Sequence, residues 1–292
     1  MNHHHQSELC LSFKELASWT WHKLAKADRL NMAFNEETIT ESLLLKLAER
    51  HSGRGLTIRS YTKNEEGTGT AATGGNPTGA DWSFWFGDSS GKGIEVRIQA
   101  KRLFVKSGKY ESLDGSGVQR KKLSSNCKGA IPLYVFYNGP CKDLSGFPIY
   151  FGSLCKYCEL DGFWPFNIFV MGCSFSHVNA IPSIDKPRPA DITWMMPWHC
   201  LVCKCFNSTN NLGSLASRVA GVLKQSYGRT VSESKTIPET DVQISFELRE
   251  RPSWVGLLEK YSKEENQSSA ALHDYLIDSE LSGVVSILEL KK

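Results

Sequence analysis

The stretch "GADWSFWFGDSSGKGIEVRIQAKRL", residues 79–103, predicts a β-hairpin. Apolar side chains recur at every second position in both halves, which is the period of a strand that buries one face. The connection between the halves, "GDSSGKG" at residues 87–93, is rich in residues that favour tight turns. Asp81, Gln99 and Lys101 fall on the opposite, outward face, and the last two lie roughly 6 to 7 Å apart along their strand.

The sequence on either side of the hairpin predicts a mixture of helices and strands. Residues 8–30 carry apolar side chains at helical spacing, and the acidic start of "NEETITESLLLKLAERHSG" suits the positive end of a helix at residues 36–51. The Gly- and Thr-rich residues 62–79 favour a loop. Further helices are expected at residues 116–128, 254–265 and 269–279, and further strands at residues 131–138, 166–175, 199–206 and 283–290.

The order of these elements predicts one mixed α/β fold with additions. The chain has 292 residues, of which 40% are hydrophobic, and this is enough for a sizeable core. We find no internal repeat and no Pro-rich linker that divides the chain cleanly. We expect an N-terminal helical segment at residues 1–30, an α/β core at residues 31–215, and a C-terminal α/β extension at residues 216–292 that packs on the core.

Charge is distributed unevenly along the chain. The formal net charge is only +3, but residues 97–122 hold eight basic side chains against two acidic ones. From residue 233 to the end, twelve acidic side chains face seven basic ones. Positive charge therefore gathers around the hairpin, where it would favour an anionic partner.

Several features favour a cytoplasmic protein. No run approaches the roughly 20 apolar residues of a membrane span, and the N-terminal residues lack the basic start and apolar core of a signal peptide. The nine cysteines are an odd number, which without an export signal favours reduced thiols over a disulfide framework.

The polar residues of the hairpin suit metal-assisted chemistry on a phosphate. The Asp81 carboxylate is a hard oxygen ligand of the kind Mg²⁺ prefers, and Mg²⁺ takes only one or two protein carboxylates besides water and substrate phosphate. A neighbouring lysine such as Lys101 can orient a metal-bound water and stabilise negative charge in the transition state.

Asp81, a short hairpin and then Gln99-Ala100-Lys101 resemble the active-site signature of the PD-(D/E)xK nuclease superfamily, which includes restriction endonucleases. Together, "NEETITESLLLKLA", "GADW", "QAKRL" and "IPLYVFYN" look like an uncharacterised prokaryotic family of that superfamily, often suspected of a role in phage defence. The resemblance covers about residues 35–205. It implies a restriction-endonuclease-like mixed β-sheet core flanked by helices, with the C-terminal part of the chain as an addition.

The resemblance also implies roles for individual residues. Asp81 and Gln99 would hold Mg²⁺, for which Mn²⁺ could substitute, and Lys101 would be the catalytic lysine. The acidic residue of the preceding helix would be Glu37, with Glu41 one turn on as its substitute. The expected contacts to substrate come from the basic stretch after the hairpin: Arg102, Gln119, Lys121 and Lys122.

Other residue types in the sequence suggest less specific roles. Cys155 with Cys158 and Cys200 with Cys203 form two C-x-x-C pairs that could hold a structural zinc, with Cys205 and His199 as fallback ligands. Core packing is the preferred explanation of these cysteines, because cysteine in a buried strand behaves as a small hydrophobic residue. His177 has no visible partner and is interpreted as a packed or surface residue. Most tryptophans belong to the core, but three could line a nucleic-acid groove: Trp82, Trp194 and Trp198.

The sequence therefore supports one leading function and two alternatives. The first is a Mg²⁺-dependent endonuclease that hydrolyses DNA. Its catalytic residues would be Asp81, Gln99, Lys101 and Glu37. The second is a catalytically silent module of the same fold that binds nucleic acid, and the third is a zinc-ordered interaction protein. DNA is the expected partner, and RNA is an alternative substrate. A regulatory protein or activator and a homodimeric state are further alternatives, whereas a membrane partner is not expected.

Overall fold

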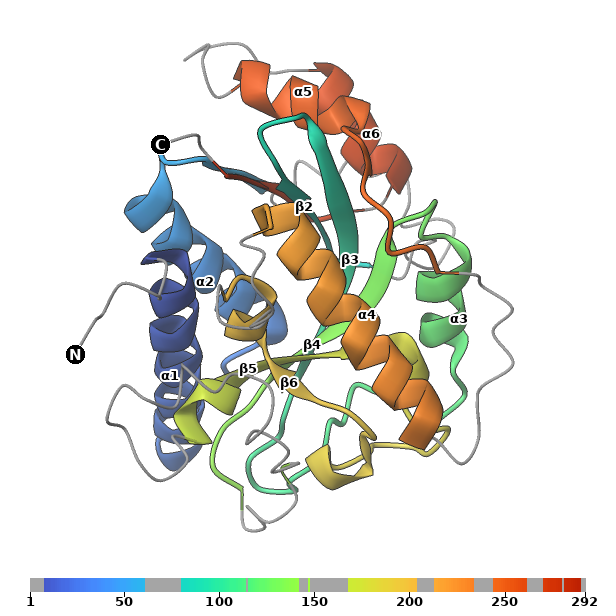
Figure 1. Cartoon of the computed structure of the whole chain (residues 1–292). Helices are drawn as coiled ribbons and strands as arrows, with labels where there is room; N and C mark the ends of the chain where they lie inside the picture. The colour runs from blue at the N-terminus through green and yellow to red at the C-terminus, as the bar shows by residue number, and fades with distance from the viewer. Residues whose placement is uncertain are drawn as a thin grey trace, which may run out of the picture.

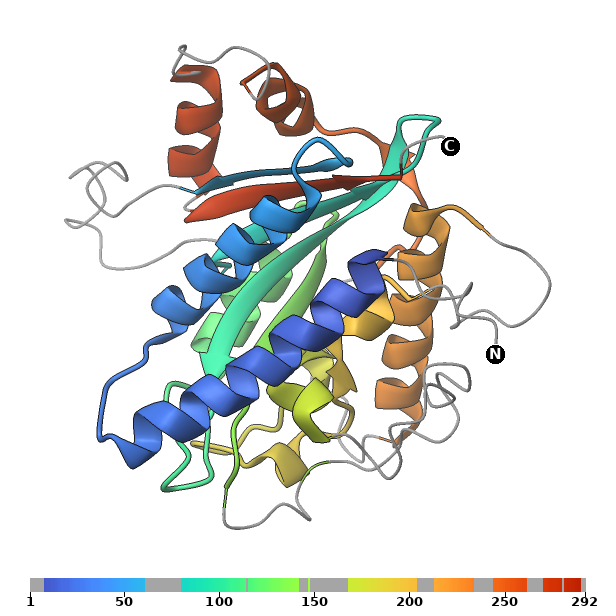
Figure 2. The same ribbon diagram turned by 90° about the vertical axis from the view of Figure 1, so that its left-hand side faces the viewer.

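The computed structural model describes residues 8–60, 80–113, 115–141, 147, 168–203, 213–233, 244–261, 270–279 and 281–289. Within these ranges the chain forms an open, mixed sheet of eight strands with helices on both faces (Figures 1 and 2). None of the described helices is both long enough and apolar enough to span a membrane. The expected mixed α/β class is confirmed.

The sheet has the order β1-β8-β2-β3-β4-β5-β6, and β7 pairs with the start of β3. β8 is parallel to β2 and β4 is parallel to β3, whereas the other neighbours are antiparallel. The strands are β1 (Leu56–Ser60), β2 (Trp82–Gly87), β3 (Lys92–Arg102), β4 (Ile131–Tyr137), β5 (Cys173–His177), β6 (Met196–Pro197), β7 (Arg249–Glu250) and β8 (Gly283–Leu288).

Helices cover the two faces of the sheet in two groups. The helices are α1 (Glu8–Arg29), α2 (Glu36–His51), α3 (Val118–Ser125), α4 (Leu215–Glu233), α5 (Ser253–Tyr261) and α6 (Ala270–Ser279), with 3-10 turns η3 (Ile168–Gly172), η4 (Val178–Ala180), η5 (Pro189–Asp191) and η6 (Trp198–Leu201). Apolar side chains of α1, α2 and α4 share one core with the sheet, and those of α3, α5 and α6 share the other. Figure 2 shows α1 and α2 side by side on the first face.

The hairpin predicted from residues 79–103 is confirmed as β2 and β3. The two strands pair antiparallel, with Trp82 opposite Ile98, and the turn between them uses Gly91 at a φ of 86°, a left-handed conformation that glycine adopts without strain. The apolar residues of both strands lie on the core of α1, α2 and α4, as their two-residue period predicts.

The opposite face of the hairpin is not exposed, which corrects the expectation of an outward, solvated surface. Glu95, Arg97, Gln99 and Lys101 on β3 are each 5% exposed or less. A second apolar layer covers this face, because α5 and α6 contribute buried side chains such as Trp254 and Leu272 to it. The hairpin is therefore central to the molecule, and its polar residues lie between two cores.

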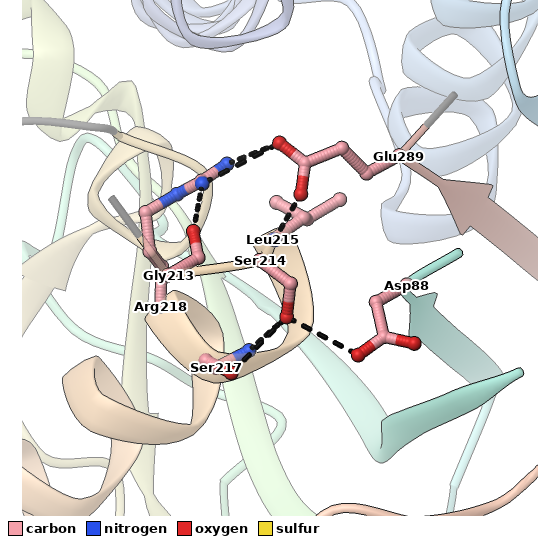
Figure 3. Close-up of polar contacts among 7 residues, drawn as sticks. All are labelled: Asp88, Gly213, Ser214, Leu215, Ser217, Arg218 and Glu289. Carbon is pink, nitrogen blue, oxygen red and sulfur yellow. Dashed lines mark hydrogen bonds and ion pairs between the residues drawn. The ribbon is translucent and has the colours of Figure 1, made fainter. Parts of the chain in front are cut away.

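The C-terminal residues complete the sheet. β8 lies between β1 and β2 and pairs with both along its length, so the sheet crosses the boundary expected at residue 215. Directly after β8, the Glu289 carboxylate accepts a hydrogen bond of 2.6 Å from the backbone N–H of Leu215 at the start of α4 and lies 3.4 Å from Arg218 (Figure 3). Nearby, Ser214 Oγ donates to Asp88 in the turn between β2 and β3 at 3.3 Å (Figure 3).

Two expected elements differ in kind. Residues 199–206 were expected to form a strand, but Trp198–Leu201 form the 3-10 turn η6. In residues 166–175 the 3-10 turn η3 precedes β5, and only the last three residues belong to that strand. A short run that is apolar on all sides is compatible with any buried element, so periodicity alone does not identify it as a strand.

Candidate functional site

Asp81 lies at the point where β2 begins, held by its neighbours on both sides. Its backbone N–H donates to the carbonyl of Ile98 on β3, and its carbonyl accepts from Ser282 just before β8, each at 2.8 Å. Its side-chain Oδ2 accepts two hydrogen bonds, from Gln99 Nε2 at 2.6 Å and from the backbone N–H of Ala100 at 2.8 Å. The sheet therefore fixes this half-buried carboxylate beside the polar residues of β3.

The surroundings of Asp81 make its carboxyl group unusually weakly acidic. Burial raises the pKa of Asp81 from 3.8 to about 6, and the nearby charge of Glu36 adds to the increase. The Ala100 N–H, the Lys101 ammonium and the Gln99 amide oppose this increase because each stabilises the ionised form. A group that changes its charge near neutral pH is typical of functional sites.

Lys101 is a buried lysine whose charge acts on Asp81. Its side chain is on β3, two residues after Gln99, and the residue is 4% exposed. Within the described residues its ammonium makes no hydrogen bond and no ion pair, yet its charge acts on Asp81. A lysine whose charge acts on a carboxylate of raised pKa is typical of functional sites.

Gln99 also holds an unused polar atom. Its Nε2 donates to Asp81, whereas its Oε1 is buried and has no hydrogen-bond partner in the described part of the chain. Buried amide oxygens nearly always have a partner, so an unpaired one is available to a ligand.

The helix acid that reaches this site is Glu36 rather than the expected Glu37. Glu36 is the first residue of α2, and its Oε1 accepts hydrogen bonds from the backbone N–H of Arg102 at 2.9 Å and from Ser112 Oγ at 2.7 Å. Glu37 and Glu41 are both exposed, and the carboxylate that acts on the pKa of Asp81 is Glu36. The acidic first turn of α2 pointed to both Glu36 and Glu37, but the sequence did not show which of the two reaches the site.

Arg102 fastens the end of β3 to the start of α2. Its guanidinium donates to the carbonyl of Phe34 at 2.9 Å and lies over the ring of Phe104, 4.1 Å from the ring centroid. Burial lowers the pKa of Arg102, although nearby Glu36 and Glu111 oppose the effect. These contacts give Arg102 a structural role, and its expected contact with substrate stays a prediction.

The other expected substrate residues lie on α3. Lys121 is exposed and both Gln119 and Lys122 are partly exposed, so all three can meet solvent. In the ranges that the structure describes, no hydrogen bond or ion pair joins them to the Asp81 cluster, by which we mean Asp81, Gln99, Lys101 and Glu36. Arg120 between them is instead buried and donates to the carbonyl of Ile181 at 2.6 Å, which fixes α3 to the turn after β5.

The residues given secondary roles lie in the core. Trp82, Trp194 and Trp198 are each 6% exposed or less, which rules out the expected groove lining. His177 accepts a hydrogen bond from the Asn179 backbone at 3.2 Å, and burial lowers its pKa to about 3, so it is a packed, neutral residue.

The cysteine pairs are only partly described. Cys200 and Cys203 are buried in the first core, whereas Cys155, Cys158 and Cys205 lie outside the described residues. His199 is also buried. Among the described side chains, no three His, Cys, Asp or Glu residues form a group that could hold a metal ion.

Hard oxygen donors are nevertheless present around Asp81. Within the described residues, Asp81 Oδ1, Gln99 Oε1 and Glu36 Oε2 make no hydrogen bond. Two carboxylates and one amide oxygen suit Mg²⁺, which commonly keeps several of its waters and takes few protein ligands. The residues present therefore fit a weakly held Mg²⁺ or Mn²⁺ ion.

Comparison with known proteins identifies a family. No curated protein and no solved structure matches the chain at a significant level. A family model described as "Family of unknown function (DUF6615)" matches residues 9–287. The match runs from α1 into β8 and includes every residue of the Asp81 cluster, so the chain belongs to the DUF6615 family.

Proposed function

We propose that the protein is a metal-dependent nuclease that hydrolyses phosphodiester bonds of DNA at the Asp81 cluster, defined as Asp81, Gln99, Lys101 and Glu36. The observation that carries the proposal is the buried residue Lys101, whose positive charge acts on the carboxylate of Asp81, a group with a pKa of about 6. The similarity of Asp81, Gln99 and Lys101 to the PD-(D/E)xK signature supports the same reaction. A role in defence against phage rests on that resemblance alone.

Each residue of the cluster has a distinct task in this proposal. Asp81 and Gln99 hold the metal ion through their free oxygens, and Glu36 completes the set from the start of α2. A bound Mg²⁺ supplies Lewis acidity and a more acidic water. Lys101 orients the attacking water and stabilises the negative charge that develops on the phosphate.

The immobile setting of the cluster favours catalysis over loose ion binding. Oδ2 of Asp81 is fixed by two hydrogen bonds, and one oxygen of Glu36 is fixed by two more. Groups held in this way need little reorganisation when charge develops, and this preorganisation is a large part of electrostatic catalysis.

The proposal is tested by incubating the protein with supercoiled plasmid, linear DNA and RNA, each with Mg²⁺, Mn²⁺ or EDTA. The expected result is cutting of DNA that needs the metal and is lost in Asp81→Asn, which keeps the shape of the side chain. Cutting that persists in EDTA or in Asp81→Asn would point to a contaminant or to another site. Absence of cutting under all conditions would count against the proposal.

The hydrogen bond from Gln99 favours a second candidate, a nucleic-acid-binding module without catalysis. Gln99 directs its amide nitrogen to Asp81, and an amide brings no negative charge to a metal site. This candidate predicts binding of DNA that is sensitive to salt but needs no metal. It also predicts that Gln99→Glu gains metal binding, which isothermal titration with Mg²⁺ would measure against wild type.

A further inference from the structure

We infer that Lys23 on α1 and Lys46 on α2 form a phosphate-binding pair that docks the backbone of duplex DNA beside the Asp81 cluster. The inference rests on the proposed nuclease function and specifies where its substrate lies. No contact with substrate was expected from these two lysines, since the basic stretch predicted to bind substrate lies at residues 97–122.

Trp19 brings the two lysines together. The Nζ of Lys23 lies 5.6 Å from the centroid of the Trp19 ring, and the Nζ of Lys46 lies 5.4 Å from it. An ammonium over an indole ring is held by the electrostatic attraction of the ring face. One half-buried tryptophan on α1 thus contacts cations from two helices.

Neither lysine is neutralised by a carboxylate. In the described ranges, Lys23 and Lys46 make no ion pair. Glu15, one turn before Trp19 on α1, forms an ion pair with Arg50 at 2.6 Å. Glu49, three residues after Lys46 on α2, makes no ion pair with Lys46. Each ammonium group lacks a carboxylate partner within the described residues and attracts an anion, and an anion near the Trp19 ring is attracted by both.

Contacts connect this pair to the candidate site. The ring of Trp19 lies 6.1 Å from that of Phe34, in an edge-on arrangement. The carbonyl of Phe34 accepts a hydrogen bond from Arg102, whose backbone N–H donates to Glu36 of the Asp81 cluster. These contacts connect Trp19, and with it the lysine pair, to Glu36 at the start of α2.

Phosphate chemistry matches this arrangement better than base recognition does. Lysine ammonium groups bind phosphates as point charges, and the two lysines occupy the ring of Trp19 on which a base would stack. The spacing of phosphates along both strands of a duplex presents several charges to such a pair. The surface would therefore add affinity that depends on salt and not on sequence.

The test is the binding of a fluorescently labelled DNA duplex in EDTA, followed by anisotropy, for the double variant Lys23→Ala and Lys46→Ala. The matched control is Lys224→Ala with Lys260→Ala, which removes two exposed lysines from α4 and α5. We expect the first variant to bind about tenfold more weakly at low salt, and its slope of log affinity against log salt to fall by about 2. Lys23→Arg with Lys46→Arg should bind like wild type.

The outcomes separate this inference from the proposed function. Equal affinities and salt slopes for the Lys23 and Lys46 variant and its control would overturn the docking surface while leaving cleavage at Asp81 untouched. Loss of binding in that variant together with normal binding by Asp81→Asn would support the surface, whether or not wild type cuts DNA. Tighter binding of RNA than of duplex DNA would overturn the assignment of the substrate.

Discussion

At the scale of single residues, the raised pKa of Asp81 makes the candidate site detectable without any substrate. Because the pKa is about 6 in the folded chain against an ordinary 3.8, folding favours the protonated carboxyl group. Wild type therefore loses stability as the pH rises from about 4 through 6. Asp81→Asn stays neutral and should be equally stable below about pH 4 and more stable at pH 7 by up to about 3 kcal/mol.

Urea denaturation of both proteins across this pH range measures the difference. An advantage for Asp81→Asn that does not change with pH would mean that the charge of Asp81 is not its cause. Titration with Mg²⁺ provides a second reading, because only the ionised carboxylate binds the metal and the stabilisation by Mg²⁺ should grow as the pH passes about 6.

Glu36 and Glu37 form a matched pair of neighbouring carboxylates on α2. Glu36 reaches the Asp81 cluster, whereas Glu37 is exposed. We expect Glu36→Gln to reduce metal-dependent cleavage by at least about tenfold, since it removes one of two carboxylate charges from the proposed metal site. Glu37→Gln should retain nearly full activity in the same rate assay. Loss of activity in Glu37→Gln with normal activity in Glu36→Gln would show that Glu37 is the metal ligand, as predicted from the sequence.

The residues of the site differ in how far the sequence could predict them. The two-residue period of the strand was enough to place Gln99 and Lys101 on one face, and the hairpin then brought Asp81 beside them. Choosing between Glu36 and Glu37 requires the rotation of α2 about its axis, because consecutive helical residues differ in direction by about 100°. That rotation is set by packing against the sheet, which the local pattern does not contain.

At the scale of elements, β3 carries a buried charged cluster under α6. Glu95 accepts hydrogen bonds from Ser83 at 2.6 Å and from Arg249, and it lies 3.8 Å from Arg97. Arg97 also donates to the carbonyl of Asn126 at 3.0 Å. The cluster joins β3 to β7 and to the end of α3.

Glu95→Gln should therefore be strongly destabilising, by about 3 kcal/mol or more, because it leaves buried Arg97 without a counter-charge. The control is Glu250→Gln, whose exposed side chain lies 3.9 Å from Lys92 and should change stability by less than about 1 kcal/mol. Chemical denaturation of the two variants measures both effects. Similar small losses for both would show that the buried cluster contributes little.

Most elements with a clear period were predictable from the sequence, and the elements without one were not. The amphipathic pattern placed α2 at Glu36–His51, as expected, and the hairpin and β4 followed from their apolar alternation and length. The short strand β1 was not anticipated, because it has only five residues, most of them half-buried. The helix α4 was missed although its buried residues, such as Leu215, Val219 and Val222, recur at helical spacing. The 3-10 turn η6 was mistaken for a strand since all its residues are buried.

At the scale of the whole molecule, the sheet joins the two ends of the sequence. β8 lies between β1 and β2, and its next residue, Glu289, is fixed to the start of α4. A chain that ends at residue 243 would lose β8, α5 and α6, and β2 would expose one edge along its length. We expect this truncated chain to be unfolded by circular dichroism, while a chain lacking only residues 290–292 folds normally.

A folded, monomeric truncated chain would show that the residues after 243 are an addition that the core does not need, in line with the extension expected from the sequence. The sequence did predict the strand at residues 283–290, but it did not predict its neighbours. Strand order depends on contacts between residues far apart in the chain, and the parallel pairing of β8 with β2 joins positions about 200 residues apart.

The central claim is that Lys101 belongs to a hydrolytic site, and the most direct measurement is the rate of Mg²⁺-dependent plasmid cutting by Lys101→Met. Methionine fills the space of the buried side chain without its charge, so the protein should fold with unchanged or higher stability. Lys92→Met, at the exposed start of the same strand, is the matched control. We predict that Lys101→Met cuts at least about a hundredfold more slowly than wild type and Lys92→Met; equal rates for all three proteins would contradict the account.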